Sequence, residues 1–285
     1  MLDWRSDASH RGILFMYEQF YGFYESPFNI TPDPRFLFFS GRHQEAFGHL
    51  LFGIKERKGF IQITGEVGTG KTTLCRALLE ALDPGYRTAL ILNPSMSGTQ
   101  LLRTIVEEFG LAARDHDRVS LLDALNSFLL DQVNEGHDAV LVVDEAQNLS
   151  PELMEQVRLL SNLETDRQKL LQIVLMGQPE LRQILDEPGL RQLRQRITVR
   201  YHLTSLDYPE TEMYIAHRLR VAGANSRPTF SRGALRRIFR YSGGVPRLIN
   251  AVCDKALLCG YVEGEDHLTT RQLKKAIREL EGHVQ

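Results

Sequence analysis

The pattern of hydrophobic and polar residues alternates between two periods along the middle of the chain. Short apolar runs predict buried β-strands, and between them apolar residues recur every three or four positions, which predicts amphipathic helices. Strands are expected at 59–64, 88–92, 139–143, 170–176 and 197–203, and helices at 42–56, 72–82, 99–109, from Ser120 onward and at 150–163. This order predicts an α/β fold in which helices cover both faces of a parallel sheet, an αβα arrangement. The alternation within 197–203 places that strand near an edge of the sheet.

The two ends of the chain depart from this alternation. After Tyr208 no strand pattern remains, and helices are expected near 209–222, 231–241, 245–260 and 269–281. At the other end, 17–40 is rich in aromatic residues and proline, so we expect an irregular segment without a helix whose aromatic rings are buried. We therefore divide the chain into an αβα domain at 16–205 and a small all-α domain at 206–285.

The first fifteen residues show no sustained period, and a new composition begins at Met16. We interpret 1–15 as a non-native or flexible extension, with a partner-binding arm as the alternative. The segment lacks the basic start and long apolar core of a secretory signal. No apolar run of the chain approaches the roughly 18 residues that a membrane-spanning helix needs, so no transmembrane segment is predicted.

Composition places the chain among ordinary globular proteins. Hydrophobic residues make up 42% and charged residues 25% of the 285 residues, which excludes a wholly disordered or collagen-like chain. Cys75, Cys253 and Cys259 are too few and too irregularly spaced for a disulfide framework or a zinc site. We interpret them as buried thiols of a protein from a reducing compartment, which predicts a cytoplasmic location.

Charge is distributed unevenly. The net charge is −2, but 205–285 holds 13 Lys and Arg against 9 Asp and Glu, while the remainder holds 21 against 27. Four arginines share one face of the predicted helix at 231–241: Arg232, Arg236, Arg237 and Arg240. This face is either a solvated surface or a contact for the phosphate backbone of a nucleic acid.

The strongest chemical signal lies at 65–72, which matches G-x-x-x-x-G-K-[ST] between a predicted strand and a predicted helix. Glycines let backbone N–H groups surround phosphate oxygens, and the helix N-terminus adds partial positive charge. Lys71 is expected to reach the β- and γ-phosphates of ATP, and the Thr72 hydroxyl to bind Mg²⁺. The expected nucleotide contacts are Gly65, Glu66, Val67, Gly68, Thr69, Gly70, Lys71, Thr72, Thr73 and Asp144.

Asp144 and Glu145 follow the buried strand at 139–143. An acid at the carboxyl end of such a strand faces the phosphate crevice, so we expect Asp144 to bind Mg²⁺ together with Thr72. The adjacent Glu145 is placed to accept a proton from the attacking water, which favours hydrolysis over phosphoryl transfer to a substrate hydroxyl. The alternative is that Glu145 only caps the following turn.

Four further polar residues are candidates for catalysis. Gln178 ends the strand at 170–176 and is expected to sense the γ-phosphate or position the water; otherwise it is a turn residue before a proline. Arg194 and Arg196 precede the last strand, and one of them, preferably Arg196, is expected to reach the nucleotide of a neighbouring subunit; otherwise they form surface ion pairs. Arg247 opens a helix of the all-α domain and is expected to reach the phosphates if that domain folds back over the sheet.

Together these segments resemble the ExeA/GspA family of AAA+ ATPases, which is associated with general (type II) secretion. The resemblance extends from about Met16 to about Glu281 and rests on 20–23, 27–28, 31–37, 65–72, 144–149, 158–165, 177–181 and 243–250. It implies a P-loop αβα core with a helical lid and nucleotide bound between the subunits of a homo-oligomer. It also implies that Asp144 and Glu145 form the Walker B pair, that Gln178 is sensor 1 and Arg247 sensor 2, and that 32–43 lies near the adenine.

We therefore expect Mg²⁺-dependent ATP hydrolysis that drives assembly of a type II secretion or pilus-like envelope system, with a peripheral inner-membrane location as a refinement of the cytoplasmic one. Full-length secretion members continue into a transmembrane helix and a peptidoglycan-binding region, and the chain stops at Gln285, so it is expected to be a truncated module or a stand-alone member. The alternatives are a DNA-binding ATPase that regulates transposition and a nucleotide-gated scaffold with negligible turnover.

Overall fold

The computed structural model describes residues 16–282 except 30, 32, 112–116 and 166–167. The extension predicted at 1–15 lies outside the described residues. The chain divides into two compact units, one at 41–204 and one that joins the described part of 1–40 to 205–285. None of the helices within the described ranges combines the length and the apolar character that crossing a bilayer requires.

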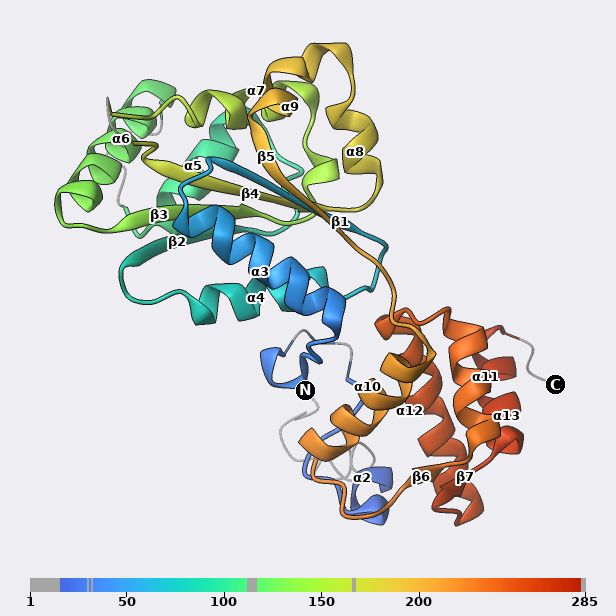
Figure 1. Cartoon of the computed structure of the whole chain (residues 1–285). Helices are drawn as coiled ribbons and strands as arrows, with labels where there is room; N and C mark the ends of the chain where they lie inside the picture. Colours follow the sequence, from blue (N-terminus) through green and yellow to red (C-terminus); the bar gives the residue numbers. More distant parts are fainter. Residues whose placement is uncertain (1–15, 30, 32, 112–116, 166–167, 283–285) are drawn as a thin grey trace, which may run out of the picture. The chain divides into compact units, whose positions relative to one another are not determined.

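The 41–204 unit is built on a five-stranded parallel sheet in the order β2-β3-β4-β1-β5 (Figure 1). The strands are β1 (Phe60–Gly65), β2 (Tyr86–Ile91), β3 (Asp138–Val143), β4 (Leu171–Gly177) and β5 (Ile197–Leu203). β1, β3 and β4 are almost entirely buried, as continuous apolar runs predict, and β5 lies at an edge and is half-exposed. The predicted parallel sheet and its edge strand are confirmed.

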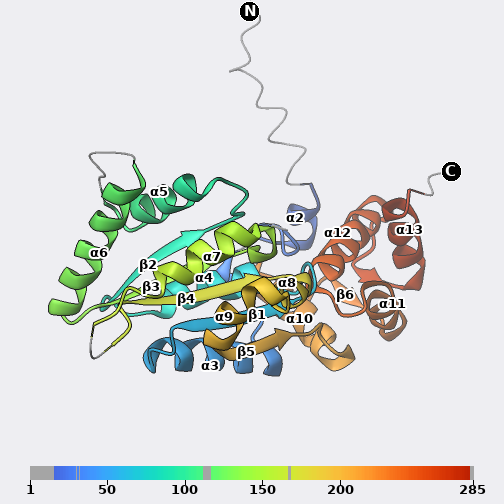
Figure 2. The ribbon, with the colours of Figure 1, turned by 90° about the horizontal axis from the view of Figure 1, so that it is seen from above.

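Helices cover both faces of this sheet, so the predicted αβα arrangement is confirmed (Figures 1 and 2). One face carries α3 (Gly41–Lys55) and α4 (Lys71–Ala81). The other face carries α5 (Gly98–Glu108), α6 (Arg118–Asn134), α7 (Pro151–Leu160), α8 (Glu180–Leu185) and α9 (Arg191–Arg196), together with the short 3₁₀ helices η3 (Ala146–Asn148) and η4 (Pro188–Leu190). The apolar residues of α5, α6 and α7 form one continuous core with alternate residues of the strands.

Capping residues explain where two of these helices begin. Ser150 caps α7, close to the predicted start of this helix, because its hydroxyl accepts a hydrogen bond from the Leu153 N–H. The helix before α7 was expected to begin at Ser120, and the position of its N-terminal cap differs from this prediction by three residues. Asp117 caps α6, and its carboxylate accepts bonds from the N–H groups of Val119 and Ser120. A carboxylate at this position also meets the helix dipole favourably, which a hydroxyl does not.

The other unit contains α10 (Tyr208–Val221), α11 (Arg232–Ser242), α12 (Pro246–Glu263) and α13 (Thr270–Leu280), close to the four predicted helices. It is not purely helical, because β6 (Thr229–Phe230) and β7 (His267–Leu268) pair in parallel. It also contains α2 (Met16–Tyr21) and η2 (Pro34–Phe36), so the expectation that 17–40 holds no helix is wrong. α2 ends before the first proline of the segment, so proline does not oppose it.

The segment 16–40 packs in the helical unit, whereas the sequence placed it in the αβα domain. The cause is aromatic burial: Tyr21, Phe23, Phe28 and Phe36 lie in the hydrophobic cluster of α10–α13. The Tyr21 hydroxyl also donates to the carbonyl of Leu257 at 3.0 Å. The aromatic rings are buried as predicted, but their partners are helices that follow them by about 200 residues.

Candidate active site

The phosphate-binding loop connects the carboxyl end of β1 to the N-terminus of α4, as predicted. Gly65 closes the strand against β5: a Cβ there would lie 2.5 Å from the Leu203 carbonyl oxygen. Gly70 precedes the helix with a φ of +99°, which side chains other than glycine rarely tolerate. These two positions explain why the loop needs glycine and how its N–H groups are gathered at a helix N-terminus.

Lys71 is buried at the first position of α4, with 5% of its surface exposed. Its ammonium donates to the carbonyl oxygens of Gly65 at 2.7 Å and Glu66 at 2.9 Å. Burial lowers the pKa of Lys71, and the nearby carboxylates of Glu145 and Asp144 oppose that shift. The ammonium is therefore held within the loop by uncharged carbonyls, with carboxylates close by, in a position suited to phosphate.

The remaining loop residues divide between the surface and the interior. Glu66 and Val67 are exposed, Gly68 has a positive φ of +82°, and Thr73 is half-buried on α4. The Thr69 hydroxyl donates to the Glu66 carbonyl at 2.8 Å and fixes the tip of the loop. The loop is thus shaped by its own side chains, and its predicted nucleotide contacts run without interruption from the end of β1 to the first turn of α4.

Thr72 and Asp144 meet although 72 positions separate them in the sequence. The Thr72 hydroxyl donates to Asp144 Oδ2 at 2.6 Å, and Asp144 Oδ1 accepts from the Glu145 N–H at 2.9 Å. Asp144 is 2% exposed. A hydroxyl and a carboxylate are oxygen ligands of the kind that Mg²⁺ prefers, and Mg²⁺ in such sites takes its other ligands from water and phosphate. These residues therefore fit the predicted metal.

Glu145 lies one residue beyond Asp144, with a left-handed backbone (φ +52°) that is uncommon outside glycine and is found at functional sites. Its Oε2 accepts a hydrogen bond from the Gln178 side-chain amide at 3.1 Å and another from Gln147 Nε2 at 2.5 Å. Gln147 Oε1 in turn accepts from the Gln178 N–H at 3.0 Å. The structure therefore brings Glu145 and Gln178 together and adds Gln147, which holds both.

The sequence assigned no individual role to Gln147 or His43; the resemblance only includes Gln147 in 144–149 and places His43 within 32–43, the segment expected near the adenine. Gln147 reaches back to Glu145 because η3 tightens the chain directly after the strand. His43 is 3% exposed on α3, and its Nε2 lies 3.0 Å from the Thr69 carbonyl oxygen, so it supports the phosphate-binding loop. For Gln147 the spacing of two after the acidic pair was a usable signal, whereas no local pattern marks His43.

The two candidate finger arginines lie at the other end of the sheet. Arg196 ends α9, directly before β5, and its guanidinium donates to the Ser161 hydroxyl and the Asn162 side chain, both at 2.6 Å. Arg194 pairs with Asp186 at 3.0 Å. Since Leu203 pairs with Gly65 at the far end of β5, six residues of strand, about 20 Å, separate Arg196 from the loop of its own chain. The structure does not bring these arginines to Lys71.

Arg247 belongs to the helical unit. It is exposed in the first turn of α12, after Pro246. Its expected contact with phosphate stays a prediction, as does the expected proximity of 32–43 to the adenine. The described residues of the sheet unit thus hold a phosphate-binding loop, an ammonium, oxygen ligands for Mg²⁺ and a positioned carboxylate. This set can bind a nucleoside triphosphate and activate a water molecule next to it.

Comparison with known proteins places this arrangement in a family. Residues 54–185 match the AAA domain family. General secretion pathway protein A of Aeromonas hydrophila is 47% identical over 268 residues, which are 94% of this chain and 49% of that protein. The chain therefore spans about half the length of the curated relative that it matches.

Two solved structures show the same fold at low sequence identity. The ORC2 protein of Aeropyrum pernix, in ADPNP-ADP complexes, has a TM-score of 0.66 and 18% identity, and the match covers 90% of this chain and 71% of that one. The Drosophila ORC bound to DNA has a TM-score of 0.68 and 16% identity, and the match covers 98% of this chain and 69% of that one. These structures confirm the predicted fold. The sequence relative and the AAA domain match confirm the predicted resemblance to the ExeA/GspA family of AAA+ proteins.

Proposed function

We propose that the chain hydrolyses ATP to ADP and phosphate in a Mg²⁺-dependent reaction. The observation that carries this proposal is the carboxylate of Glu145, which two side-chain amides hold one residue beyond Asp144. A protein that only bound nucleotide would need the loop but no positioned base. This contrast favours turnover over the alternative of a nucleotide-gated scaffold.

Each residue has a separate task in this reaction. Backbone N–H groups of the loop and the Lys71 ammonium bind the β- and γ-phosphates and balance their charge. Thr72 and Asp144 would hold Mg²⁺, which supplies positive charge next to the phosphate that is transferred. Glu145 accepts a proton from the attacking water, and Gln178 keeps the carboxylate of Glu145 in place while its own amide faces the same crevice.

The decisive experiment compares Glu145→Gln with Glu152→Gln, which changes an exposed acid in the first turn of α7. Glu145→Gln should lower kcat for ATP by at least about 100-fold, in line with general-base catalysis, while the Kd for a fluorescent ATP analogue stays within twofold. Glu152→Gln should leave both unchanged. If Glu145→Gln retains wild-type turnover, Glu145 is not the base and the proposed mechanism is wrong.

For the biological role we propose assembly or regulation of a type II secretion or pilus-like envelope system by a homo-oligomer. The support is the 47% identity with a protein named for general secretion. The position of Arg196 is consistent with an oligomer, because an arginine about 20 Å from the loop of its own chain would have to reach a neighbour's nucleotide if it takes part in catalysis. A cytoplasmic protein at the inner face of the inner membrane suits this role.

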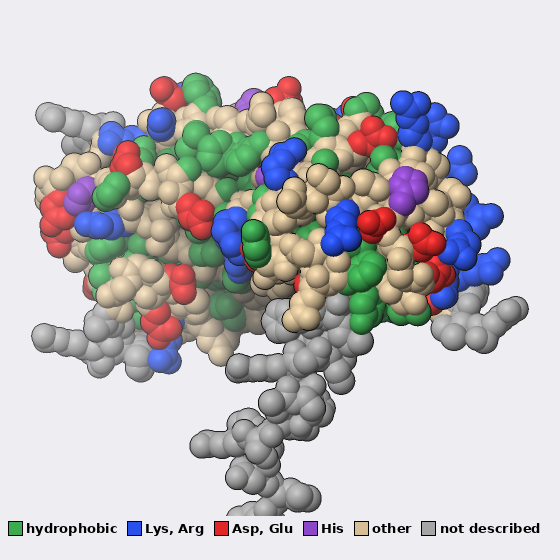
Figure 3. All heavy atoms as spheres, turned by 90° about the horizontal axis from the view of Figure 1, so that it is seen from below, with side chains coloured by type: hydrophobic (Ala, Val, Ile, Leu, Met, Phe, Trp, Pro, Cys, Tyr) green, Lys and Arg blue, Asp and Glu red, His purple; other side chains and the backbone are tan. Residues whose placement is uncertain are grey.

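DNA binding is the second candidate, and the surface of the helical unit favours it. Arg232, Arg236 and Arg240 are exposed on α11, and within the described ranges none of them forms an ion pair with a carboxylate. Figure 3 shows Lys and Arg side chains gathered at the edge where α11 and α13 lie in Figure 1. Guanidinium groups without acidic partners are available to the phosphates of a nucleic acid.

Steady-state ATPase assays with and without duplex DNA distinguish the two roles. A DNA-binding regulator should show a several-fold higher rate with DNA and a linear fall of log K with log[salt]. Replacing Arg232, Arg236 and Arg240 with alanine should then reduce that slope by about one for each phosphate that the variant no longer neutralises. Arg271→Ala is the control, because Arg271 already pairs with Glu263 at 2.9 Å. A rate that rises with protein concentration but ignores DNA supports the envelope role instead.

A further inference from the structure

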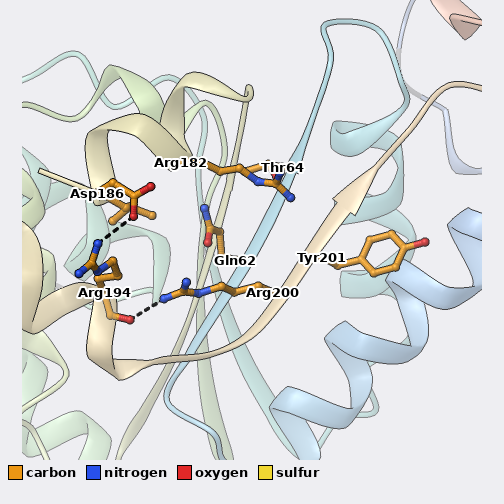
Figure 4. Close-up of a pocket in the computed structure, with 8 residues that line it drawn as sticks. Gln62, Thr64, Arg182, Asp186, Arg194, Arg200 and Tyr201 are labelled. Atoms are coloured by element: carbon orange, nitrogen blue, oxygen red, sulfur yellow. Dashed lines mark hydrogen bonds and ion pairs between the residues drawn. The ribbon is translucent and has the colours of Figure 1, made fainter.

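A cavity of about 200 Å³ lies inside the 41–204 unit and is lined by residues of β1, β5, α8 and α9 (Figure 4). Its charged lining residues are Arg182, Asp186, Arg194 and Arg200, and we call it the arginine pocket. No residue of the phosphate-binding loop lines it, and neither member of the acidic pair at 144–145 does. The arginine pocket therefore contains none of the groups proposed for ATP hydrolysis, although Thr64, which lines it, directly precedes the loop.

The arginine pocket carries an excess of positive charge. Arg194 is balanced by Asp186, because their side chains form an ion pair at 3.0 Å. Arg200 donates to the backbone carbonyl of Arg194 at 2.6 Å, a contact that leaves its charge uncompensated. Arg182 forms no ion pair with any described residue. Arg182 and Arg200 are both exposed, so two guanidinium groups remain at the edge of the cavity to balance an anion bound in it.

Gln62 supplies an uncharged donor at the wall of the same cavity. It lies in the middle of β1 with 4% of its surface exposed. Its Nε2 is buried and has no hydrogen-bond partner among the described residues. Figure 4 shows its amide in the space bounded by Arg182, Arg194 and Arg200. Buried amide donors in folded proteins almost always have a partner, so this one points to an acceptor atom of a ligand.

The volume and the charge of the arginine pocket restrict the kind of ligand that it can bind. Pockets that hold drug-sized molecules or cofactors measure about 300–1,000 Å³, so a cavity of about 200 Å³ is too small for a whole nucleotide. A phosphate group carries about −1.5 to −2 charges near neutral pH, which two unpaired guanidinium groups match. Arginine also presents a planar fork of donors to phosphate oxygens.

We propose that the arginine pocket binds a phosphate group through Arg182, Arg200 and the buried amide of Gln62. Two sources share this chemistry. The group is either free inorganic phosphate, which enters the cavity from solution, or the terminal phosphate of a nucleotide that a second copy of the chain presents at the pocket mouth. The first source requires one chain, whereas the second requires association.

Binding of free phosphate is tested on the full chain with its nucleotide site filled by Mg²⁺ and a non-hydrolysable ATP analogue. Equilibrium dialysis with radiolabelled inorganic phosphate, at constant ionic strength, should detect one saturable site for each chain. Arg182→Ala and Gln62→Leu should each weaken this site about 10- to 100-fold, the loss expected for a hydrogen bond to a charged group. Arg191→Ala is the matched control, because this arginine is exposed on α9 and does not line the pocket.

The Gln62→Leu variant distinguishes a loss of phosphate binding from a failure to fold. The substitution removes a buried amide nitrogen that lacks a hydrogen-bond partner among the described residues, so the variant should unfold at the same urea concentration as the wild type or a higher one. Added phosphate should raise the urea midpoint of the analogue-saturated wild type and leave that of Gln62→Leu unchanged. Neither readout depends on hydrolysis, so the proposal can fail while the ATPase proposal stands, and the reverse also holds.

The second source is tested by sedimentation of the same variants with the ATP analogue or with ADP. If a neighbour's terminal phosphate fills the pocket, the analogue should strengthen association relative to ADP, and Arg182→Ala and Gln62→Leu should abolish the difference while Arg191→Ala keeps it. Saturable phosphate binding or this association, lost in both variants, supports the proposal. The absence of both, or their persistence in both variants, overturns it.

Discussion

The position of Gln147 gives a test of how the carboxylate of Glu145 is held. Its Nε2 donates to Glu145 Oε2 at 2.5 Å, and its Oε1 accepts the Gln178 N–H at 3.0 Å. Gln147 is not expected to touch nucleotide, metal or the attacking water and acts through the carboxylate of Glu145, so it is a positioning residue. Gln147→Leu keeps the approximate volume of the side chain and removes both hydrogen bonds.

The size of the effect follows from the bond that is removed. A hydrogen bond to a charged group contributes about 1.5–3 kcal/mol, which corresponds to roughly 10- to 150-fold in an equilibrium or a rate. The Gln178 amide remains on the same oxygen and limits the loss. We therefore expect kcat to fall about 10- to 100-fold in Gln147→Leu, while the Kd for nucleotide stays within twofold, because the phosphate-binding loop is unchanged.

A second variant separates positioning from packing. Gln147→Glu keeps an acceptor for the Gln178 N–H but places an oxygen where the amide donor faced Glu145. Its kcat should fall at least as far as that of Gln147→Leu. Asn148→Ala, on the same 3₁₀ turn, is the control and should keep kcat within twofold. Wild-type kcat in a folded Gln147→Glu chain would refute the reasoning.

Three further predictions concern other parts of the chain. Arg196→Ala should lower kcat about 10³- to 10⁵-fold. When Arg196→Ala chains are titrated into Glu145→Gln chains, the ATPase rate of the mixture should exceed the sum of the rates of the two separate variants. Arg218→Met should destabilise the protein by about 3 kcal/mol in urea unfolding, because Arg218 is 7% exposed and its guanidinium donates to the carbonyls of Pro27 and Asn29, which would lose their partner. Burial raises the pKa of Cys75 to about 12 and that of Cys253 well above its usual value, so mass spectrometry should find neither thiol alkylated at pH 8 until urea is added.

Elements with a strong local pattern were predictable from the sequence. β3 and β4 are apolar except for Asp138 and Gln172, and α7 begins with a serine cap and a proline, so these elements lie within a few residues of their predicted positions. α8 and α9 were missed, because each has only six residues, too few for a helical period to show. α2 was missed because prolines further along the segment dominated its interpretation.

The placement of the segment 16–40 shows a different limit of prediction from the sequence. Aromatic composition predicts burial but carries no information about the partner, because burial of apolar surface has no direction. Tyr21 finds its partners in α12, where its hydroxyl donates to the Leu257 carbonyl, and Arg218 on α10 reaches back to Pro27. Such contacts join residues about 190 to 240 positions apart, and no periodicity along the chain encodes them.

Strand order decides whether the candidate residues form one site, and periodicity does not give that order. Lys71 follows β1, Asp144 follows β3 and Gln178 follows β4, and the observed order β3-β4-β1 makes these three strands neighbours. Because all three are parallel, their carboxyl ends lie at the same edge, about 5 Å apart from one strand to the next. Had β2 or β5 been inserted between them, the Thr72 hydroxyl could not reach Asp144 at 2.6 Å. The motifs identified the chemistry of each strand end, and the crossover connections, which only the complete fold specifies, bring the strand ends within reach of one nucleotide.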